Sequence, residues 1–281
     1  MTTVDNEIVW RGFTRPQLDD AYNNSAAVAG SAAKVAEWTQ RSAVFRERHG
    51  GELDLAYGPR PRNRLDLFRS GAPDAPLLVY IHGGYWQRNQ KDFYSCLGEG
   101  PLAHGIDMAF VGYTLAPDAT MTDIVEEIRA AVRWLRREGE RLRVARGGLI
   151  VSGWSAGGHL TAMAMHLPEV DAGLAISGVY DVEPCRLNYL NEKLRMTPQE
   201  AEAVSPIRHL PQRSGPLAIA YGGDELPELR RQSEDYGRAL QAGGLRADVF
   251  ALAGHDHFSI LEELAAADGQ LTRMVLDLAR R

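Results

Sequence analysis

Cysteine is scarce in this 281-residue chain, and long apolar segments are absent. The two cysteines, Cys96 and Cys185, lie far apart without metal-ligand spacing, which argues against a disulfide framework. The eight histidines form no HxxxH or HExxH pattern, and no apolar run approaches the roughly 18 residues that a membrane span requires. Residues 1–7 lack the basic and apolar regions of a secretion signal. We therefore expect a cytoplasmic protein with reduced thiols, no metal and no cofactor.

Positive charge is also in deficit, because the formal net charge at pH 7 is -6. A surface that binds nucleic acid needs a basic stripe, so nucleic acid is not an expected partner. Hydrophobic residues make up 44% of the chain and charged residues 24%, which is typical of a globular protein with a sizeable core. The expected partner is a small molecule, with no nucleic acid and no membrane. A homodimer is compatible with the sequence.

The order of expected elements indicates an α/β protein with a mostly parallel central sheet. Two helical stretches, 16–29 and 31–48, open the chain, and an edge hairpin over 52–57 and 64–68 follows. Apolar strands then alternate with helices, as in a parallel sheet covered on both faces. The strands are expected over 77–81, 107–113, 149–152, 172–177, 217–221 and 247–252, and helices near 92–97, over 122–137, after 155, over 228–241 and at the C-terminus. Residues 1–48 are expected to form a small helical cap on a larger domain over residues 49–281.

A serine lies at a sharp turn between an expected strand and an expected helix. Residues 153–157 read GWSAG, with Ser155 at the centre and Gly153 and Gly157 on either side. Small neighbours let the strand and the helix close around a strained turn residue, and the helix N-terminus offers free N–H groups beside the hydroxyl. This setting favours Ser155 as a nucleophile over a purely structural glycine turn.

A nucleophilic serine needs a base and an acid that orients the base. Asp224 follows one expected strand, and His257 follows the next. The chain order serine, acid, histidine is that of the α/β-hydrolase fold. Two alternatives stay open from spacing alone: His255 lies in the same loop as His257, and Glu225 replaces Asp224 if the loop is shifted by one residue.

The serine also needs hydrogen-bond donors for the oxyanion that forms when it attacks a carbonyl. Residues 82–86 read HGGYW directly after an expected strand, similar to the HGGG-type loop of lipases and esterases. The expected donors are backbone N–H groups of Gly83, Gly84, Tyr85 and Ala156. The side chain of His82 is expected to brace the loop rather than transfer protons.

These motifs resemble the hormone-sensitive-lipase-like branch of the α/β-hydrolases, and within it the arylformamidase (kynurenine formamidase) type. The resemblance runs from about residue 50 to the C-terminus. Its further segments read SGVYDVEP at 177–184, LRMT at 194–197, DELPE at 224–228 and DHF at 256–258. The resemblance implies Ser155, Asp224 and His257 as the catalytic triad, and it decides against His255.

The chain departs from that family beside the expected site. Trp154 stands where many members carry histidine, and Gly158 stands where many carry alanine. Tyr85 takes an oxyanion-loop position that is glycine in many lipases, which leaves its ring free to line the pocket. We expect the substrate pocket to be lined by Trp86, Trp154 and Tyr180.

The expected activity is hydrolysis of small carboxylic esters or N-formyl arylamides through an acyl-enzyme. One alternative is a dedicated N-formylkynurenine formamidase of tryptophan catabolism, which would use the same residues. Another alternative, from a different class, is a non-catalytic ligand receptor that keeps the triad on the same fold.

Overall fold

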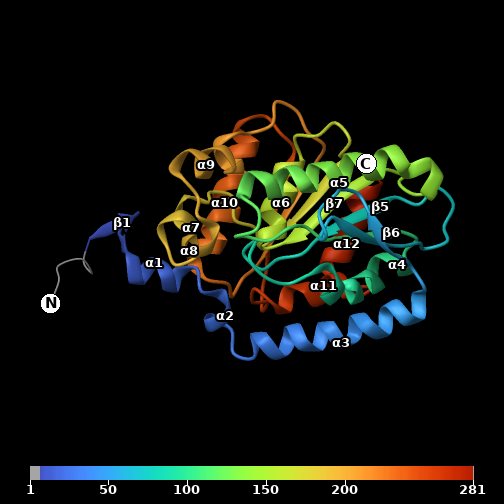
Figure 1. The fold of residues 1–281 in the computed structure, drawn as a ribbon, viewed down its shortest axis with the longest axis horizontal. Helices are drawn as coiled ribbons and strands as arrows, with labels where there is room; N and C mark the ends of the chain where they lie inside the picture. Colours follow the sequence, from blue (N-terminus) through green and yellow to red (C-terminus); the bar gives the residue numbers. More distant parts are fainter. Residues whose placement is uncertain (1–6, 281) are drawn as a thin grey trace.

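An eight-stranded β-sheet forms the centre of the computed structural model, which describes residues 7–280 (Figure 1). The strands are β3 (Glu52–Ala56), β4 (Arg64–Phe68), β5 (Leu77–Ile81), β6 (Asp107–Val111), β7 (Leu149–Trp154), β8 (Ala172–Ile176), β9 (Leu217–Gly222) and β10 (Ala247–Leu252). They lie side by side in the order β10-β9-β8-β7-β5-β6-β4-β3. Strands β5 to β10 pair in parallel, and β3 and β4 form an antiparallel hairpin at one edge. The predicted fold class is confirmed.

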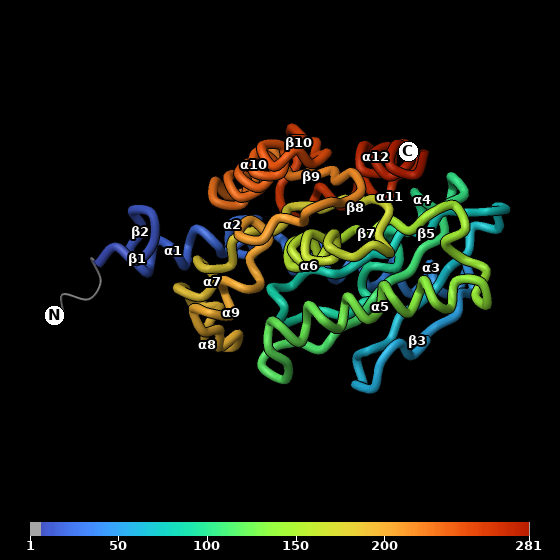
Figure 2. The backbone as a smooth tube through the Cα atoms, turned by 90° about the horizontal axis from the view of Figure 1, so that it is seen from above, coloured from blue at the N-terminus to red at the C-terminus, as the bar shows by residue number. Residues whose placement is uncertain are grey.

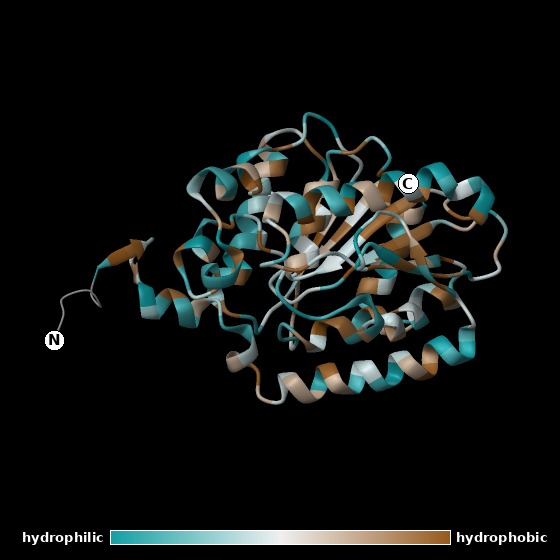
Figure 3. Ribbon diagram, in the orientation of Figure 1, coloured by the Kyte–Doolittle hydropathy of each residue, from teal (hydrophilic) through white to brown (hydrophobic). Residues whose placement is uncertain are grey.

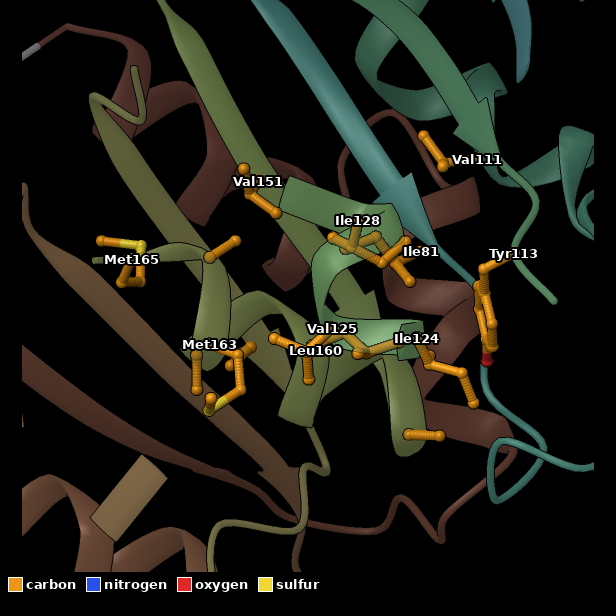
Figure 4. Packing of buried hydrophobic residues seen from close by; sticks show 14 of the residues in the cluster. Ile81, Val111, Tyr113, Ile124, Val125, Ile128, Val151, Leu160, Met163 and Met165 are labelled. Atoms are coloured by element: carbon orange, nitrogen blue, oxygen red, sulfur yellow. The ribbon is translucent and has the colours of Figure 1, made fainter. Parts of the chain in front are cut away.

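Helices cover both faces of this sheet (Figure 2). They are α1 (Arg15–Ala21), α2 (Asn24–Ala27), α3 (Ser31–His49), α4 (Glu99–Ala103), α5 (Met121–Leu142), α6 (Ala156–Ala164), α7 (Glu183–Leu187), α8 (Asn191–Leu194), α9 (Pro198–Ala203), α10 (Pro227–Ala242), α11 (Glu262–Ala265) and α12 (Gln270–Ala279). Successive residues of β5 point to opposite faces, so Val79 and Ile81 share a core with α5, α6 and α10, whereas Leu78 and Tyr80 share a core with α3, α11 and α12. Figure 4 shows the first core, in which Ile128 and Leu160 lie beside Ile81 and Val151.

Helix α5 illustrates how the sequence determines these elements. Thr120 caps its first turn, because the Thr120 side chain accepts a hydrogen bond from the Asp123 N–H and Asp123 reciprocates. Its apolar residues recur at helical spacing, and the resulting stripe is buried against the sheet. The predicted helix over 122–137 is confirmed, and the structure extends it to Leu142.

Short elements differ from the expectations. The single helix expected over 16–29 is divided into α1 and α2, because Asn23 caps a new helix and its side chain accepts from the Ala26 N–H. The helix expected near 92–97 is two 3-10 turns, η2 (Lys91–Phe93) and η3 (Ser95–Gly98). The sequence did not reveal the hairpin of β1 (Ile8–Trp10) and β2 (Phe13–Thr14) or helices α7 to α9, since elements this short carry little periodicity.

The N-terminal segment contributes to both cores. Leu18 and Tyr22 are fully buried on the side of α6 and α10, whereas Trp38 and Phe45 of α3 are buried on the side of α11 and α12. Helix α3 carries apolar and polar residues along its whole length (Figure 3). Residues 1–6 lie outside the described residues. They include the start of the expected cap and most of the segment that was examined for a secretion signal. Among residues 7–280, no helix has the length and apolar character needed to cross a membrane.

A polar contact also joins α3 to the end of the chain. The Trp38 Nε1–H donates to a Glu262 carboxylate oxygen at 2.7 Å, and Arg41 donates to both oxygens of the same carboxylate. The Trp38 ring packs against Trp154 and Phe258, with ring centroids 5.9 and 6.4 Å away.

Replacing Trp38 by alanine should lower the free energy of unfolding by about 3–5 kcal/mol, because a large buried side chain leaves a cavity. Trp38→Phe keeps most of the ring volume and removes the N–H, while Glu262 keeps Arg41 as a partner, so its loss should be about 1 kcal/mol. Urea unfolding of the two variants and the wild type measures both values. Equal losses in the two variants would contradict packing as the main contribution.

Candidate active site

Ser155 occupies a strained turn between β7 and α6. Its backbone has φ 58° and ψ -115°, a positive-φ conformation that non-glycine residues rarely adopt. The Ser155 N–H donates to the Ile176 carbonyl at 2.8 Å, which ties the turn to the neighbouring strand β8. The structure thus has the strand, turn and helix that the GWSAG motif predicts.

The glycines of the motif are required by close backbone approach. A Cβ atom on Gly157 would overlap the carbonyl of Ile81 at the end of β5, and a Cβ on Gly153 would overlap the carbonyl of Gly157. The helix after Ser155 therefore packs directly against the strand that leads into the HGGYW loop. This contact brings the serine and the loop together.

His257 is oriented by Glu225. The His257 Nδ1 atom lies 3.1 Å from Glu225 Oε2, and both side chains are buried. The other oxygen, Glu225 Oε1, accepts hydrogen bonds from the Ser177 hydroxyl at 2.5 Å and from the Gly222 N–H at 2.6 Å. Because a carboxylate oxygen accepts the hydrogen bond, Nδ1 carries the proton that it donates to Glu225, and Nε2 of the neutral ring is left with a lone pair.

The prediction of Asp224 as the orienting acid is wrong, and the one-residue alternative Glu225 takes its place. The loop after β9 turns so that the Asp224 side chain is exposed, while its N–H donates to the His255 carbonyl at 3.0 Å. The next side chain points inward, and the longer Glu225 reaches His257 from there. A one-residue shift reverses which side chain faces the site, and the glycines before Asp224 gave no signal of the direction.

The choice of His257 over His255 is consistent with the geometry. The His255 ring lies 3.2 Å from Glu263, whereas His257 lines the cavity that Ser155 lines. Asp256, between the two histidines, accepts from the N–H groups of Phe258 and Ser259 and so shapes the turn that presents His257.

Ser155 and His257 line the same cavity, which has a volume of about 310 Å³. Its wall includes Gly84 and Tyr85 of the HGGYW loop and the ring of Trp154. The N-terminal segment also lines the cavity, with residues that the sequence did not single out as pocket residues. They are Asn24, Ser25, Ser31, Ala32 and Val35. Nothing in the pattern of 24–35 distinguishes such a wall from an ordinary helix start.

The three aromatic residues expected in the pocket are not equivalent. Trp154 lines the cavity, and its Nε1–H donates to the His257 carbonyl at 2.7 Å. Trp86 is instead buried in the core, where its Nε1–H donates to His159 Nδ1. Tyr180 is also in the core and stacks on Tyr236 with ring centroids 4.5 Å apart. The expectation that Trp86 and Tyr180 line the pocket is wrong, because their rings turn toward the helices rather than the cavity.

The HGGYW loop presents unpaired donors. Gly84, Tyr85 and Trp86 have φ values of 120°, 49° and 58°, so the chain here follows an unusual path. Within the described part of the chain, the backbone N–H groups of Gly84, Tyr85 and Ala156 donate no hydrogen bond. Gly83 packs behind them against Trp154, where a Cβ would lie 2.6 Å from the indole ring. Free donors beside a serine can stabilise a negatively charged oxygen.

Two further histidines near the site are structural. Burial lowers the pKa of His82 to about 3, and its Nδ1 donates to the Gly83 carbonyl. Burial likewise lowers the pKa of His159 to about 4, and its Nε2 donates to the Val204 carbonyl. Both rings are neutral at pH 7 and hold their loops by hydrogen bonds. Among residues 7–280, no three His, Cys, Asp or Glu side chains are arranged to hold a metal ion.

The chain is similar to known formamidases and esterases. A family model described as BD-FAE matches residues 65–178. The chain is 31% identical to a kynurenine formamidase from Danio rerio over 96% of this chain and 98% of that protein. An esterase, LipC, from Mycobacterium tuberculosis is 26% identical over 71% of this chain and 57% of its own length. The crystal structure of a candidate thioesterase from Silicibacter sp. superposes with a TM-score of 0.85 at 29% identity, covering 92% of this chain and 99% of that one.

Trp154→Phe and Trp86→Phe form a matched pair, because each removes one buried indole N–H and leaves its acceptor unpaired. Both should lower the free energy of unfolding by about 1–3 kcal/mol. Only Trp154→Phe releases the His257 carbonyl, so only this variant should slow hydrolysis of p-nitrophenyl acetate, by roughly 10- to 100-fold through misplacement of the ring. Equal rates in the two variants would show that Trp154 does not hold His257.

Proposed function

We propose that Ser155, His257 and Glu225 form the catalytic triad of this chain, which belongs to the kynurenine formamidase family of α/β-hydrolases. The protein is a serine hydrolase of the carboxylesterase and arylformamidase type. The observation that carries the proposal is the buried hydrogen bond between His257 and Glu225 beside the cavity that Ser155 lines. Glu225 replaces the aspartate expected from the sequence.

The mechanism follows from these groups. His257 Nε2 takes the proton of the Ser155 hydroxyl as the Ser155 oxygen attacks the substrate carbonyl carbon. Glu225 fixes the ring tautomer and stabilises the imidazolium that forms. The N–H groups of Gly84, Tyr85 and Ala156 hold the oxyanion, each contributing about 3 kcal/mol to the transition state by analogy with measured cases. The proton on Nε2 then passes to the leaving group, and water releases the acyl group from Ser155.

The cavity supports a small substrate with an aromatic part. Its apolar wall is formed by Val35, Trp154 and Phe258, and a volume of about 310 Å³ lies at the small end of ligand sites. We propose small carboxylic esters and N-formyl arylamides as the substrate class. A dedicated N-formylkynurenine formamidase is the second candidate, supported by the name of the Danio rerio relative. The N-terminal cap over residues 1–48, the cytoplasmic location and the homodimer stay predictions.

Ser155→Ala should lower turnover of both p-nitrophenyl acetate and an N-formylkynurenine-like amide by at least about 10³-fold, because no other group can form the acyl-enzyme. The fold should be retained, since the substitution keeps the hydrogen bond that the backbone N–H of residue 155 donates to the Ile176 carbonyl. A fluorophosphonate probe should label the wild type and not the variant. A wild type that reacts with neither substrate nor probe would support the non-catalytic receptor instead.

Glu225→Gln and Asp224→Asn test the acid with two adjacent and chemically matched changes. Loss of the carboxylate beside His257 should lower kcat by about 10³- to 10⁴-fold, the order seen when a triad acid is made an amide. Asp224→Asn changes an exposed side chain and should alter kcat by less than about 3-fold. The reverse ranking in steady-state kinetics would restore Asp224 as the acid.

A further inference from the structure

Asn24, the first residue of α2, is a buried polar side chain in the cavity wall. Only 3% of its surface is exposed, and it lines the cavity together with Ser155 and His257. The mechanism described above gives it no role. A buried amide at such a position is costly unless its polar atoms are paired.

The hydrogen bonds around Asn24 fix the orientation of its amide. The Tyr85 hydroxyl donates its proton to the Tyr22 carbonyl at 2.6 Å, so its oxygen is free to accept. Asn24 Nδ2 lies 3.0 Å from that oxygen and donates to it. The same Nδ2 lies 3.3 Å from His257 Nε2, the lone-pair nitrogen of the base.

The carbonyl oxygen of Asn24 is the unusual atom. Asn24 Oδ1 is buried and has no hydrogen-bond donor within the described residues. An unpaired buried acceptor costs about 1–3 kcal/mol, so a bound ligand that offers a donor gains by pairing with it. A substrate that brings an N–H or O–H group to Asn24 Oδ1 is therefore favoured.

The reaction determines which part of the substrate reaches this place. His257 Nε2 must protonate the leaving atom, so that atom has to lie beside Nε2. Asn24 touches the same nitrogen and shares the cavity. In a secondary amide the leaving nitrogen carries one hydrogen, whereas the leaving oxygen of an ester carries none.

We propose that Asn24 is a specificity-determining residue that accepts a hydrogen bond from the scissile N–H of aryl amide substrates, an inference that rests on the proposed function. After Ser155 attacks, the N–H of the tetrahedral intermediate is held by Asn24 Oδ1, and the nitrogen lone pair is directed to the proton on His257 Nε2. That proton, which came from Ser155, moves to nitrogen as the C–N bond breaks. The free arylamine leaves with two hydrogens, and the formyl ester of Ser155 remains for water to cleave.

Three substrates and two variants test this proposal. Formanilide and phenyl formate differ only in the leaving atom, and N-methylformanilide keeps the amide but lacks the N–H. Asn24→Leu should lower kcat/KM for formanilide by about 10- to 100-fold more than for phenyl formate, because only the formanilide transition state loses a buried hydrogen bond. The preference of the wild type for formanilide over N-methylformanilide should fall by a similar factor. Val35→Ala changes the same wall without removing a hydrogen-bond acceptor. The kcat/KM ratios of formanilide to phenyl formate and of formanilide to N-methylformanilide should therefore stay within about 3-fold of the wild-type ratios.

The outcomes separate this inference from the proposed function. The rate of fluorophosphonate labelling of Ser155 reports on the nucleophile and base without an N–H, so it should change far less in Asn24→Leu than formanilide turnover does. If Asn24→Leu slows formanilide, phenyl formate and labelling equally, Asn24 only positions His257 and the specificity role is refuted, while the proposed function stands. If Ser155→Ala leaves hydrolysis of all three substrates unchanged, both proposals fail.

Discussion

The close contact between α6 and the end of β5 is the constraint on which the site depends. Gly157 packs against the Ile81 carbonyl, and the absence of a side chain there lets the turn that carries Ser155 lie close to the HGGYW loop. This approach brings two sets of free N–H groups, from the loop and from the helix start, close to the same serine. A side chain at Gly157 would separate them. The backbone therefore positions the electrostatic part of the site before any reactive side chain is considered.

The base is held by a second, independent set of contacts. Glu225 receives hydrogen bonds from Ser177 and Gly222 at the ends of β8 and β9, and Trp154 binds the His257 carbonyl from β7. Three adjacent strands thus determine the position of one imidazole ring. Parallel strands end at the same edge of a sheet, which is why residues distant in sequence meet here.

The sequence predicted what periodicity and motif geometry encode. The succession of strands and helices along the chain and the turn at Ser155 could be derived from apolar periodicity and the GWSAG motif, whereas the choice of His257 over His255 came from the family resemblance. The direction of single side chains could not be derived. The direction in which one loop turns decides whether Asp224 or Glu225 faces the site. The direction of the Trp86 ring depends on the positive φ values of Gly84, Tyr85 and Trp86, which no local pattern reveals. Asn24 was missed because its place in the cavity depends on packing between the two ends of the chain.

The wall around the base joins an early and a late part of the chain. Asn24 touches His257, and Trp38 donates to Glu262, across separations of 233 and 224 residues. During synthesis on a ribosome the first helices emerge long before their partners exist, and their buried faces stay exposed to water meanwhile. Contacts so distant in sequence close large loops, which slows folding. A chain released without its last 30 residues would lack both His257 and Glu262, so an incomplete translation product cannot act as a partial hydrolase.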